Sequence, residues 1–447
     1  MGVPLEAQAP PLPVPRTDPS GPAVTFDFPG MRVGVGEYEE GPTGTTVFYF
    51  PKGVKAATDV RGGAPGTLNA DAVRLAYEAP MMQSVVFSGG SWYGLSAATG
   101  VANELKVMRA EQGQHDFIAG VLGAIIFDVG GRRFSRVTPD DRLGAAAVRS
   151  AREGWFPLGA RGAGRFAMQG VFFLDGPLAD ASRTWAHSGQ GGAFRQIGPT
   201  RIAVFTVVNA LGAIVDRNGR VLRCRRNVAT GDCPAISSLL KDHLARVQRR
   251  GGGTGPTGNT TLTLVVTNQK LPYADLQRLG VQVHTSMARA IQPFATEEDG
   301  DVLYAVTTDE VDNPSLPSIQ LGAIASELAW DAVLNSAPVL PPTSPRTPTT
   351  LSAERLAESV GTFAFHGGGT LSVSTGATGL EARFTGDGRM YFAADRTYRL
   401  TPIAEDLFLV VGPAEDVIRF DRRAGRIVAI TLNPGPWAQS ANRGMPR

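Results

Sequence analysis

Short apolar runs alternate with longer stretches of helical spacing up to about residue 337. Five apolar runs predict strands, at residues 32–37, 45–50, 84–88, 202–209 and 262–268. The last two are rich in β-branched residues, which is typical of strands buried on both faces. Three stretches predict helices, at residues 95–105, 273–291 and 321–334. This mixture indicates an α/β (α+β) fold in which helices cover sheets.

The pattern changes after a linker rich in proline and threonine, PVLPPTSPRTPTT, at residues 338–350. Residues 351–447 read as short alternating strands separated by turns, and they predict a small antiparallel barrel or sandwich. Strands are expected at residues 370–374, 381–384, 390–393, 407–411, 417–421 and 427–432. The chain therefore divides into a main domain at 25–337, the linker and a separate β module, and residues 1–24 are expected to form a flexible tail.

Composition excludes some classes of function. The formal net charge is +2, so the chain lacks the one-sided basic field of a nucleic-acid binder. No stretch long enough to cross a bilayer is free of charges and turn residues, which predicts a soluble protein without a membrane partner. The compartment stays unknown. If the protein is exported, its signal peptide is absent from this chain and Cys224 and Cys233 could form a disulfide; two reduced thiols are the alternative.

Most familiar catalytic signatures are missing. Residues 89–94, GGSWYG, come close to the nucleophile-elbow pattern, but Tyr93 stands where that pattern needs glycine. We interpret them as a strand-to-helix turn that requires small residues. The glycines of residues 159–164 are not in dinucleotide-binding order. The histidines do not pair at metal-ligand spacing, so we expect neither a metal nor a cofactor; they are His115, His187, His243, His284 and His366.

The most informative segment is the glycine-rich run at residues 251–258, which ends in Asn259-Thr260-Thr261 and continues as a buried strand. A hydroxyl can attack the preceding carbonyl when the backbone is held in an unusual conformation, which glycine and asparagine tolerate best. Hydrolysis of the resulting ester would free a threonine whose α-amine, with a pKa of roughly 7.7–8.0, can act as its own general base. On local sequence alone, a surface loop that leads into a strand is the favoured alternative.

Two further features support a catalytic interpretation. Asn209 ends an apolar strand, where its side-chain N–H could stabilise a developing oxyanion; an asparagine that caps a turn is the alternative. Asp299 and Asp301 flank Gly300 just before the apolar run at residues 302–306. They could hold a newly formed ammonium group or orient the hydroxyl proton, and a solvated turn is the alternative.

Taken together and in order, these segments resemble the DmpA-type family of N-terminal-nucleophile hydrolases, the S58 peptidases, over about residues 25 to 337. Within that family, Gly258 to Leu262 and Asp299 to Asp301 look most like the nylon-oligomer hydrolases (6-aminohexanoate-oligomer endohydrolases). The other matching stretches are 32–36, 41–44, 61–67, 88–95, 123–128 and 207–209.

The resemblance implies a four-layer αββα sandwich, cleavage between Asn259 and Thr260 into chains 1–259 and 260–447, and a homo-oligomeric ring of such αβ heterodimers. It implies that Thr260 is nucleophile and base, that Asn209 is the oxyanion donor, and that Asp299 and Asp301 support the nucleophile. Two pocket residues common in the family, a tyrosine near residues 137–139 and a lysine before His187, have no counterpart here. The C-terminal module resembles a small lipocalin-like β domain appended to some other hydrolases.

The sequence thus predicts a self-processing amide hydrolase that cleaves linear ω-amino-acid oligomers, such as those of 6-aminohexanoate, or short peptides through an acyl-Thr260 intermediate. Alternatives within enzymes are an aminopeptidase that releases N-terminal residues from small peptides and amides, and an acyltransferase. The alternative from a different class is a catalytically inactive scaffold whose β module docks a partner.

Overall fold

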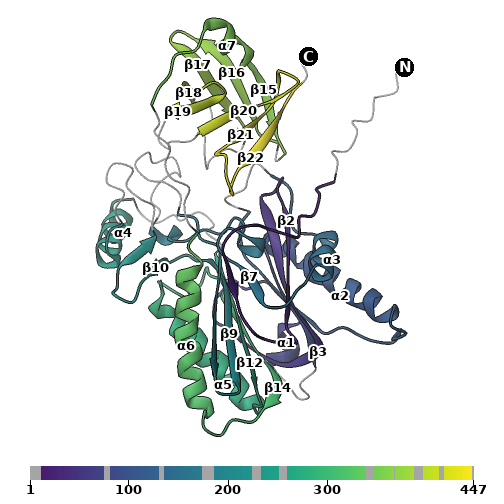
Figure 1. Ribbon diagram of the computed structural model, residues 1–447. Coiled ribbons are helices and arrows are strands. Elements are labelled where there is room, and N and C mark those ends of the chain that lie inside the picture. Colours follow the sequence, from purple (N-terminus) through teal and green to yellow (C-terminus); the bar gives the residue numbers. More distant parts are fainter. Residues whose placement is uncertain are drawn as a thin grey trace.

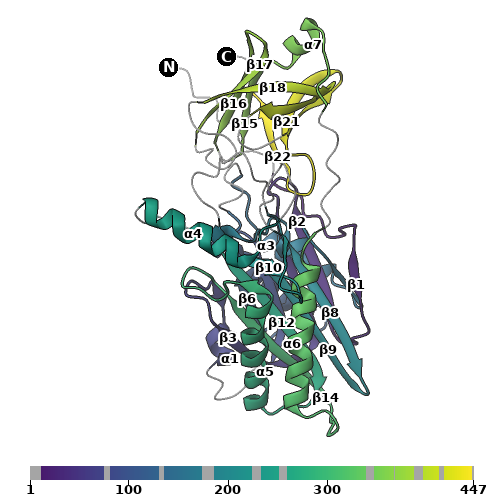
Figure 2. The same cartoon turned by 90° about the vertical axis from the view of Figure 1, so that its left-hand side faces the viewer.

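The structure is a computed structural model, and Figures 1 and 2 show it from two directions. It describes residues 12–74, 81–129, 135–173, 186–223, 233–250, 259–338, 347–366, 368–386, 396–411 and 417–444. Five features predicted from sequence lie wholly or partly outside these residues: the first part of the N-terminal tail (residues 1–11), the glycine-rich run at 251–258, Cys224, most of the linker and the strand at 390–393.

One long strand, β3 (Thr43–Val60), belongs to both halves of the main sheet. Its first half pairs with β2 (Arg32–Tyr38) and β5 (Met82–Ser88), and its second half pairs antiparallel with β14 (Val302–Val311). The strand order is β4-β6-β5-β3-β14-β12-β9-β8, with β2 added on β3. The remaining strands are β4 (Thr67–Leu68), β6 (Val121–Ile125), β8 (Gln190–Ile197), β9 (Thr200–Asn209) and β12 (Thr260–Gln269).

The two halves of this sheet face each other across an apolar core, and helices cover their outer faces (Figure 1). Phe205 of β9 lies at the centre, with its ring centroid 5.1 Å from that of Phe48 and 4.7 Å from that of Phe156. Along β12, Leu262 and Leu264 point into this core while Val265 points to the outer face, as the period of two requires. The covering helices are α2 (Leu95–Ala110), α3 (Asp141–Arg149), α5 (Tyr273–Ser286) and α6 (Ser318–Asn335). The predicted αββα sandwich is confirmed.

Helix α5 is shorter than the sequence pattern indicated. The predicted helix at 273–291 ends at Ser286 and is followed by the short 3-10 helix η4 (Met287–Arg289). Ile291 and Gln292 then form strand β13, which pairs with β10 (Ala213–Val215). Met287 and Ala290 still have right-handed helical backbone angles, and the chain becomes extended at Ile291, where its backbone pairs with β10 instead of with the preceding turn.

The C-terminal residues form a closed barrel of eight antiparallel strands in which each strand pairs with its neighbour along the chain. The first strand, β15 (Gly361–Phe365), closes the barrel by pairing with the last, β22 (Gln439–Arg443). Of the two predicted architectures, barrel and sandwich, the barrel is the one formed. Its interior is filled by side chains such as Phe363, Phe408 and Phe420. The other strands are β16 (Thr370–Gly376), β17 (Gly379–Thr385), β18 (Thr397–Ala404), β19 (Leu407–Val411), β20 (Val417–Arg423) and β21 (Arg426–Leu432).

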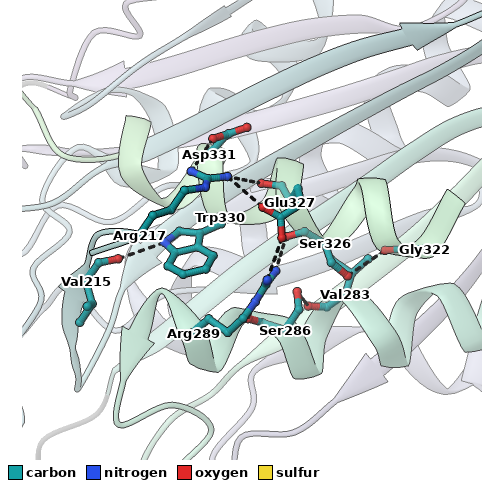
Figure 3. Close-up of polar contacts among 10 residues, drawn as sticks. All are labelled: Val215, Arg217, Val283, Ser286, Arg289, Gly322, Ser326, Glu327, Trp330 and Asp331. Atoms are coloured by element: carbon teal, nitrogen blue, oxygen red, sulfur yellow. Dashed lines mark hydrogen bonds and ion pairs between the residues drawn. The ribbon is translucent and has the colours of Figure 1, made fainter. Parts of the chain in front are cut away.

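A charged cluster fixes α6 to the segments beside it (Figure 3). Arg217, just beyond β10, contacts Asp331 at 2.8 Å and Glu327 at 3.2 Å, and Arg289 contacts Glu327 at 2.7 Å. Both guanidinium groups lie over the ring of Trp330, whose Nε1 donates to Val215 O. The hydrogen bond from Arg289 lowers the pKa of Glu327. A cavity of about 570 Å³ between α5 and α6 borders this cluster, on the outer helical layer, and no candidate catalytic residue lines it.

None of the helices in the described ranges is both long and apolar enough to cross a membrane.

Candidate active site

Thr260 and Asn209 lie opposite each other in the sheet. Thr260 is the first residue of β12 and Asn209 the last of β9, and the antiparallel register pairs them directly. Residues paired in this way have neighbouring side chains on the same face of the sheet. Both are buried, with 2% and 1% of their surface exposed. The structure therefore brings together the two residues that the sequence selected independently.

The carbonyl of Asn259 receives two hydrogen bonds. Thr260 Oγ1 donates to Asn259 O at 2.6 Å, and the backbone N of Gly300 donates to the same oxygen at 2.7 Å. This is the carbonyl of the peptide bond that would be cleaved. A hydroxyl beside it supplies a candidate nucleophile, and an N–H on its oxygen would stabilise the negative charge that develops there. Gly300 N was not anticipated from sequence, because a backbone donor carries no sequence signal.

The carboxylates of Asp299 and Asp301 lie beside Thr260, and no hydrogen bond links either of them to its hydroxyl. Asp301 accepts from Thr261 N at 2.5 Å and from Ala295 N at 3.0 Å. Asp299 accepts from the backbone N and the hydroxyl of Thr296, and from Leu211 N at 3.3 Å. Asp301 therefore fixes the backbone of Thr261, directly after the Asn259–Thr260 bond, whereas Asp299 holds the loop at Thr296 and the backbone of Leu211.

These two carboxyl groups are in an unfavourable electrostatic environment while the chain is intact. Burial raises the pKa of Asp299, and hydrogen bonds from Thr296 and Leu211 oppose that change. Burial raises the pKa of Asp301 well above its ordinary value, and the nearby charge of Asp299 raises it further. A positive charge formed next to this pair would lower both pKa values, because it favours the ionised forms.

Two glycines permit the close backbone contacts around Thr260. A Cβ added at Gly300 would lie 2.5 Å from Thr260 Oγ1, and one added at Gly62 would lie 2.2 Å from Asp299 O. The loop that carries Gly62 is joined to this segment by Gly62 N donating to Asp301 O and Ala64 N donating to Asp299 O. Neither glycine is required by a positive φ, so the constraint is lack of space.

The side-chain amide of Asn209 is held from both sides. Its Nδ2 donates to Phe127 O at 2.9 Å, and its Oδ1 accepts from Met168 N at 2.9 Å. The second N–H of Nδ2 is the one that could be offered to a substrate. Sequence reasoning selected Asn209 but neither partner, since both contribute only backbone atoms.

The segment at residues 89–94 forms the strand-to-helix turn that the sequence predicted. Strand β5 ends at Ser88, the 3-10 helix η1 (Ser91–Gly94) follows, and α2 begins at Leu95. Gly90 has a φ of 84°, and a Cβ at Gly94 would lie 1.8 Å from the carbonyl oxygen of Gly89. Gly90 is therefore required by its positive φ, and Gly94 by the lack of space for a side chain.

The described residues contain no group of three or more His, Cys, Asp or Glu side chains arranged to hold a metal ion. Cys233 is in a disulfide. Of the two alternatives that the sequence left open, the bonded state is the one found for this residue; Cys224, the other cysteine in the sequence, lies outside the described residues.

Comparison with known proteins identifies the family. The model of Peptidase family S58 matches residues 23–339. The chain belongs to this family. The 6-aminohexanoate-oligomer endohydrolase of Paenarthrobacter ureafaciens is 39% identical over 321 residues, which cover 70% of this chain and 85% of that protein. The protein of Mycobacterium tuberculosis (strain ATCC 25618 / H37Rv) named uncharacterized aminopeptidase Rv1333 is 31% identical, over 61% of this chain and 75% of its own.

Among solved structures, the l-aminopeptidase d-ala-esterase/amidase of Ochrobactrum anthropi is 15% identical and has a TM-score of 0.48, over 72% of this chain and 88% of that one. The family assignment confirms the resemblance found in the sequence. This S58 peptidase is therefore an amide-bond hydrolase of the N-terminal-nucleophile type. The matched region ends before the barrel, whose first strand begins at Gly361.

Proposed function

We propose that this S58 peptidase cleaves itself between Asn259 and Thr260 and then uses Thr260 to hydrolyse linear ω-amino-acid oligomers or short peptides. The observation that carries the proposal is the position of the Asn259 carbonyl, which has Thr260 Oγ1 and Gly300 N on its oxygen. This geometry supports the proposal, because a hydroxyl and a donor able to stabilise negative charge both lie at the bond proposed to be cleaved.

The first stage is a rearrangement within the chain. Thr260 Oγ1 attacks the carbonyl carbon of Asn259, the C–N bond breaks, and the hydroxyl proton is transferred to the departing nitrogen of Thr260. Water then hydrolyses the new ester, which leaves a carboxylate on Asn259 and a free hydroxyl and amine on Thr260. The new amine forms beside Asp299 and Asp301, where its positive charge would offset the unfavourable burial of the two carboxylates.

The second stage repeats this chemistry on a substrate. Thr260 Oγ1 attacks the substrate carbonyl while the α-amine takes up its proton, and the same amine returns the proton to the leaving nitrogen. In this proposal Asn209 Nδ2 donates to the oxyanion, and the direct pairing of Asn209 with Thr260 supports that role. Water then releases the acyl group from Thr260.

Two substrate classes are supported by the comparisons to different degrees. The relatives named 6-aminohexanoate-oligomer endohydrolase are 39% identical, whereas those named aminopeptidase are 31% or 32% identical. We therefore place linear ω-amino-acid oligomers first and N-terminal residues of small peptides second. A ring of αβ heterodimers belongs to the same proposal, and light scattering of the purified protein measures its size.

The decisive experiment follows processing and turnover together. If cleavage occurs, the 47.1 kDa chain should give bands of about 27 and about 20 kDa on a denaturing gel, scaled by residue count. The protein is then incubated with 6-aminohexanoate oligomers and with amino-acid anilides, and free amine is followed. Thr260→Ala should remain one intact band and release no amine. An intact wild-type band, or turnover by Thr260→Ala, would overturn the proposal.

A further inference from the structure

One contact between the barrel and the main domain is made by the loop between β21 and β22, and another by Arg136 N, which donates to His366 Nδ1 at 3.2 Å. Trp437 in this loop stacks on the ring of His187, with centroids 3.9 Å apart and an interplanar angle of 6°. Phe166 meets the same imidazole edge-on, at 5.3 Å and 88°. His187 is therefore held between an aromatic side chain of the barrel and one of the main domain.

A second contact anchors the same loop independently of the indole ring. The backbone O of Pro436 accepts from Arg165 Nε at 3.0 Å. Arg165 is buried and forms an ion pair with buried Glu37. The hydrogen bond from Arg165 therefore fixes the loop on the main domain, and removal of the Trp437 ring would leave that hydrogen bond in place.

The residue on which Trp437 stacks belongs to a small ribbon that also holds Asn209. His187 forms an antiparallel bridge with Met168, reinforced by Ser188 N donating to Ala167 O at 3.0 Å. Met168 N is the group that donates to Asn209 Oδ1 at 2.9 Å. An unbroken series of contacts therefore joins the barrel to the side chain opposite Thr260.

The same ribbon also holds the strand that carries Asn209. Ser188 Oγ donates to Val208 O, and Val208 N donates to Gly189 O at 2.9 Å. A displacement of His187 would therefore act on β9 through its backbone as well as on the Asn209 amide. Hydrogen-bond donors to an oxyanion need to be placed within a few tenths of an ångström, so such a displacement would be visible in the rate.

We infer that Trp437 is a positioning residue and that the barrel, through it, fixes the orientation of Asn209 for the reaction at Thr260. This inference rests on the proposed function, because it assigns a role in catalysis to Asn209. It gives the barrel a function in the hydrolase itself. That function does not need a ligand inside the barrel, whose interior is filled by side chains.

The test compares three full-length variants with the wild type, using whichever of the 6-aminohexanoate oligomer and the anilide the wild type hydrolyses. For Trp437→Ala, we expect kcat to fall roughly 3- to 10-fold, the size of one aromatic contact, with KM nearly unchanged. Trp437→Phe keeps a ring on His187 and should keep most of the rate. Val428→Ala, at an exposed position on β21, should behave as wild type and controls for changes in the barrel.

A double-mutant cycle with Asn209→Asp separates positioning from general stabilisation. If Trp437 acts through Asn209, Trp437→Ala should slow the Asn209→Asp variant much less than it slows the wild type. Equal slowing in both backgrounds, or wild-type kcat in Trp437→Ala, would overturn the inference. If Trp437→Ala fails to fold, the same cycle is run with Trp437→Leu, which also removes the ring from His187. A fall in kcat for Asn209→Asp together with a wild-type kcat for Trp437→Ala would refute this inference alone. Turnover by Thr260→Ala would refute the proposed function.

Discussion

Replacing Gly300 with alanine tests whether the space around Thr260 is needed for self-cleavage. The added Cβ would lie 2.5 Å from Thr260 Oγ1 and 2.8 Å from Ala64 O. Ordinary contact begins at 3.4 Å, so the hydroxyl of Thr260 must move by about 0.9 Å and the loop at residues 61–64 by about 0.6 Å. A misplacement of about 1 Å costs on the order of a hundredfold in rate. Movement of Gly300 N away from Asn259 O would add to this loss, because a donor to a developing oxyanion contributes on the order of a hundredfold or more.

The assay is a time course of freshly synthesised precursor on a denaturing gel, with the intact band quantified against the two fragments. Gly300→Ala should process at least about a hundredfold more slowly than the wild type. Gly280→Ala in helix α5 is the matched control, since its Cβ would meet its nearest neighbours, Leu303 and Ala305 of β14, at ordinary contact distances of 3.4 and 3.6 Å. Processing of Gly300→Ala at the wild-type rate, with the thermal midpoint unchanged, would refute the steric argument.

Three further outcomes follow from the same geometry. Asn209→Asp keeps an oxygen for Met168 N but cannot donate, so steady-state kcat should fall about 10²- to 10³-fold, and an unchanged kcat would exclude the oxyanion role. Thr260→Ser should retain processing on a denaturing gel because it keeps the hydroxyl, whereas an inactive serine variant would show that the hydroxyl alone is insufficient. In uncleaved Thr260→Ala, the pKa of Asp301 is higher in the folded chain than in the unfolded chain. Between these two pKa values the unfolded chain binds fewer protons than the folded chain, so the free energy of unfolding should fall as pH rises through that interval. Adding Asp301→Asn should weaken the dependence of the thermal midpoint on pH. The same slope in Thr260→Ala and in the double variant would contradict the assigned direction of the pKa change.

The sequence was sufficient to predict the layers of the main domain and to select Thr260 and Asn209, which the structure brings together. Short apolar runs rich in β-branched residues predicted β9 and β12, and a threonine after asparagine at the start of one strand pointed to a nucleophile. Their direct pairing, Thr260 with Asn209, was not predictable from periodicity. It depends on the register of two strands separated by about 50 residues, and register is set by tertiary packing.

The parts that sequence missed are mostly contributions of the backbone. Gly300 N, Phe127 O and Met168 N each contact a candidate residue, but any amino acid other than proline could supply those N–H groups and any could supply the carbonyl. The contact between Trp437 and His187 joins residues 250 positions apart in sequence, and neither belongs to a local motif. Such contacts become visible only once the barrel and the main domain are placed together.

The most direct test of the account is the N-terminal sequence of the smaller fragment in purified, active protein. Stepwise degradation should read Thr-Thr-Leu-Thr, beginning at Thr260, and intact mass should give a chain of residues 260–447. With an electrophilic substrate analogue, the added mass should lie on Thr260 of that chain. Active protein that shows no terminus at this position would contradict the central claim that Thr260 acts as an N-terminal nucleophile.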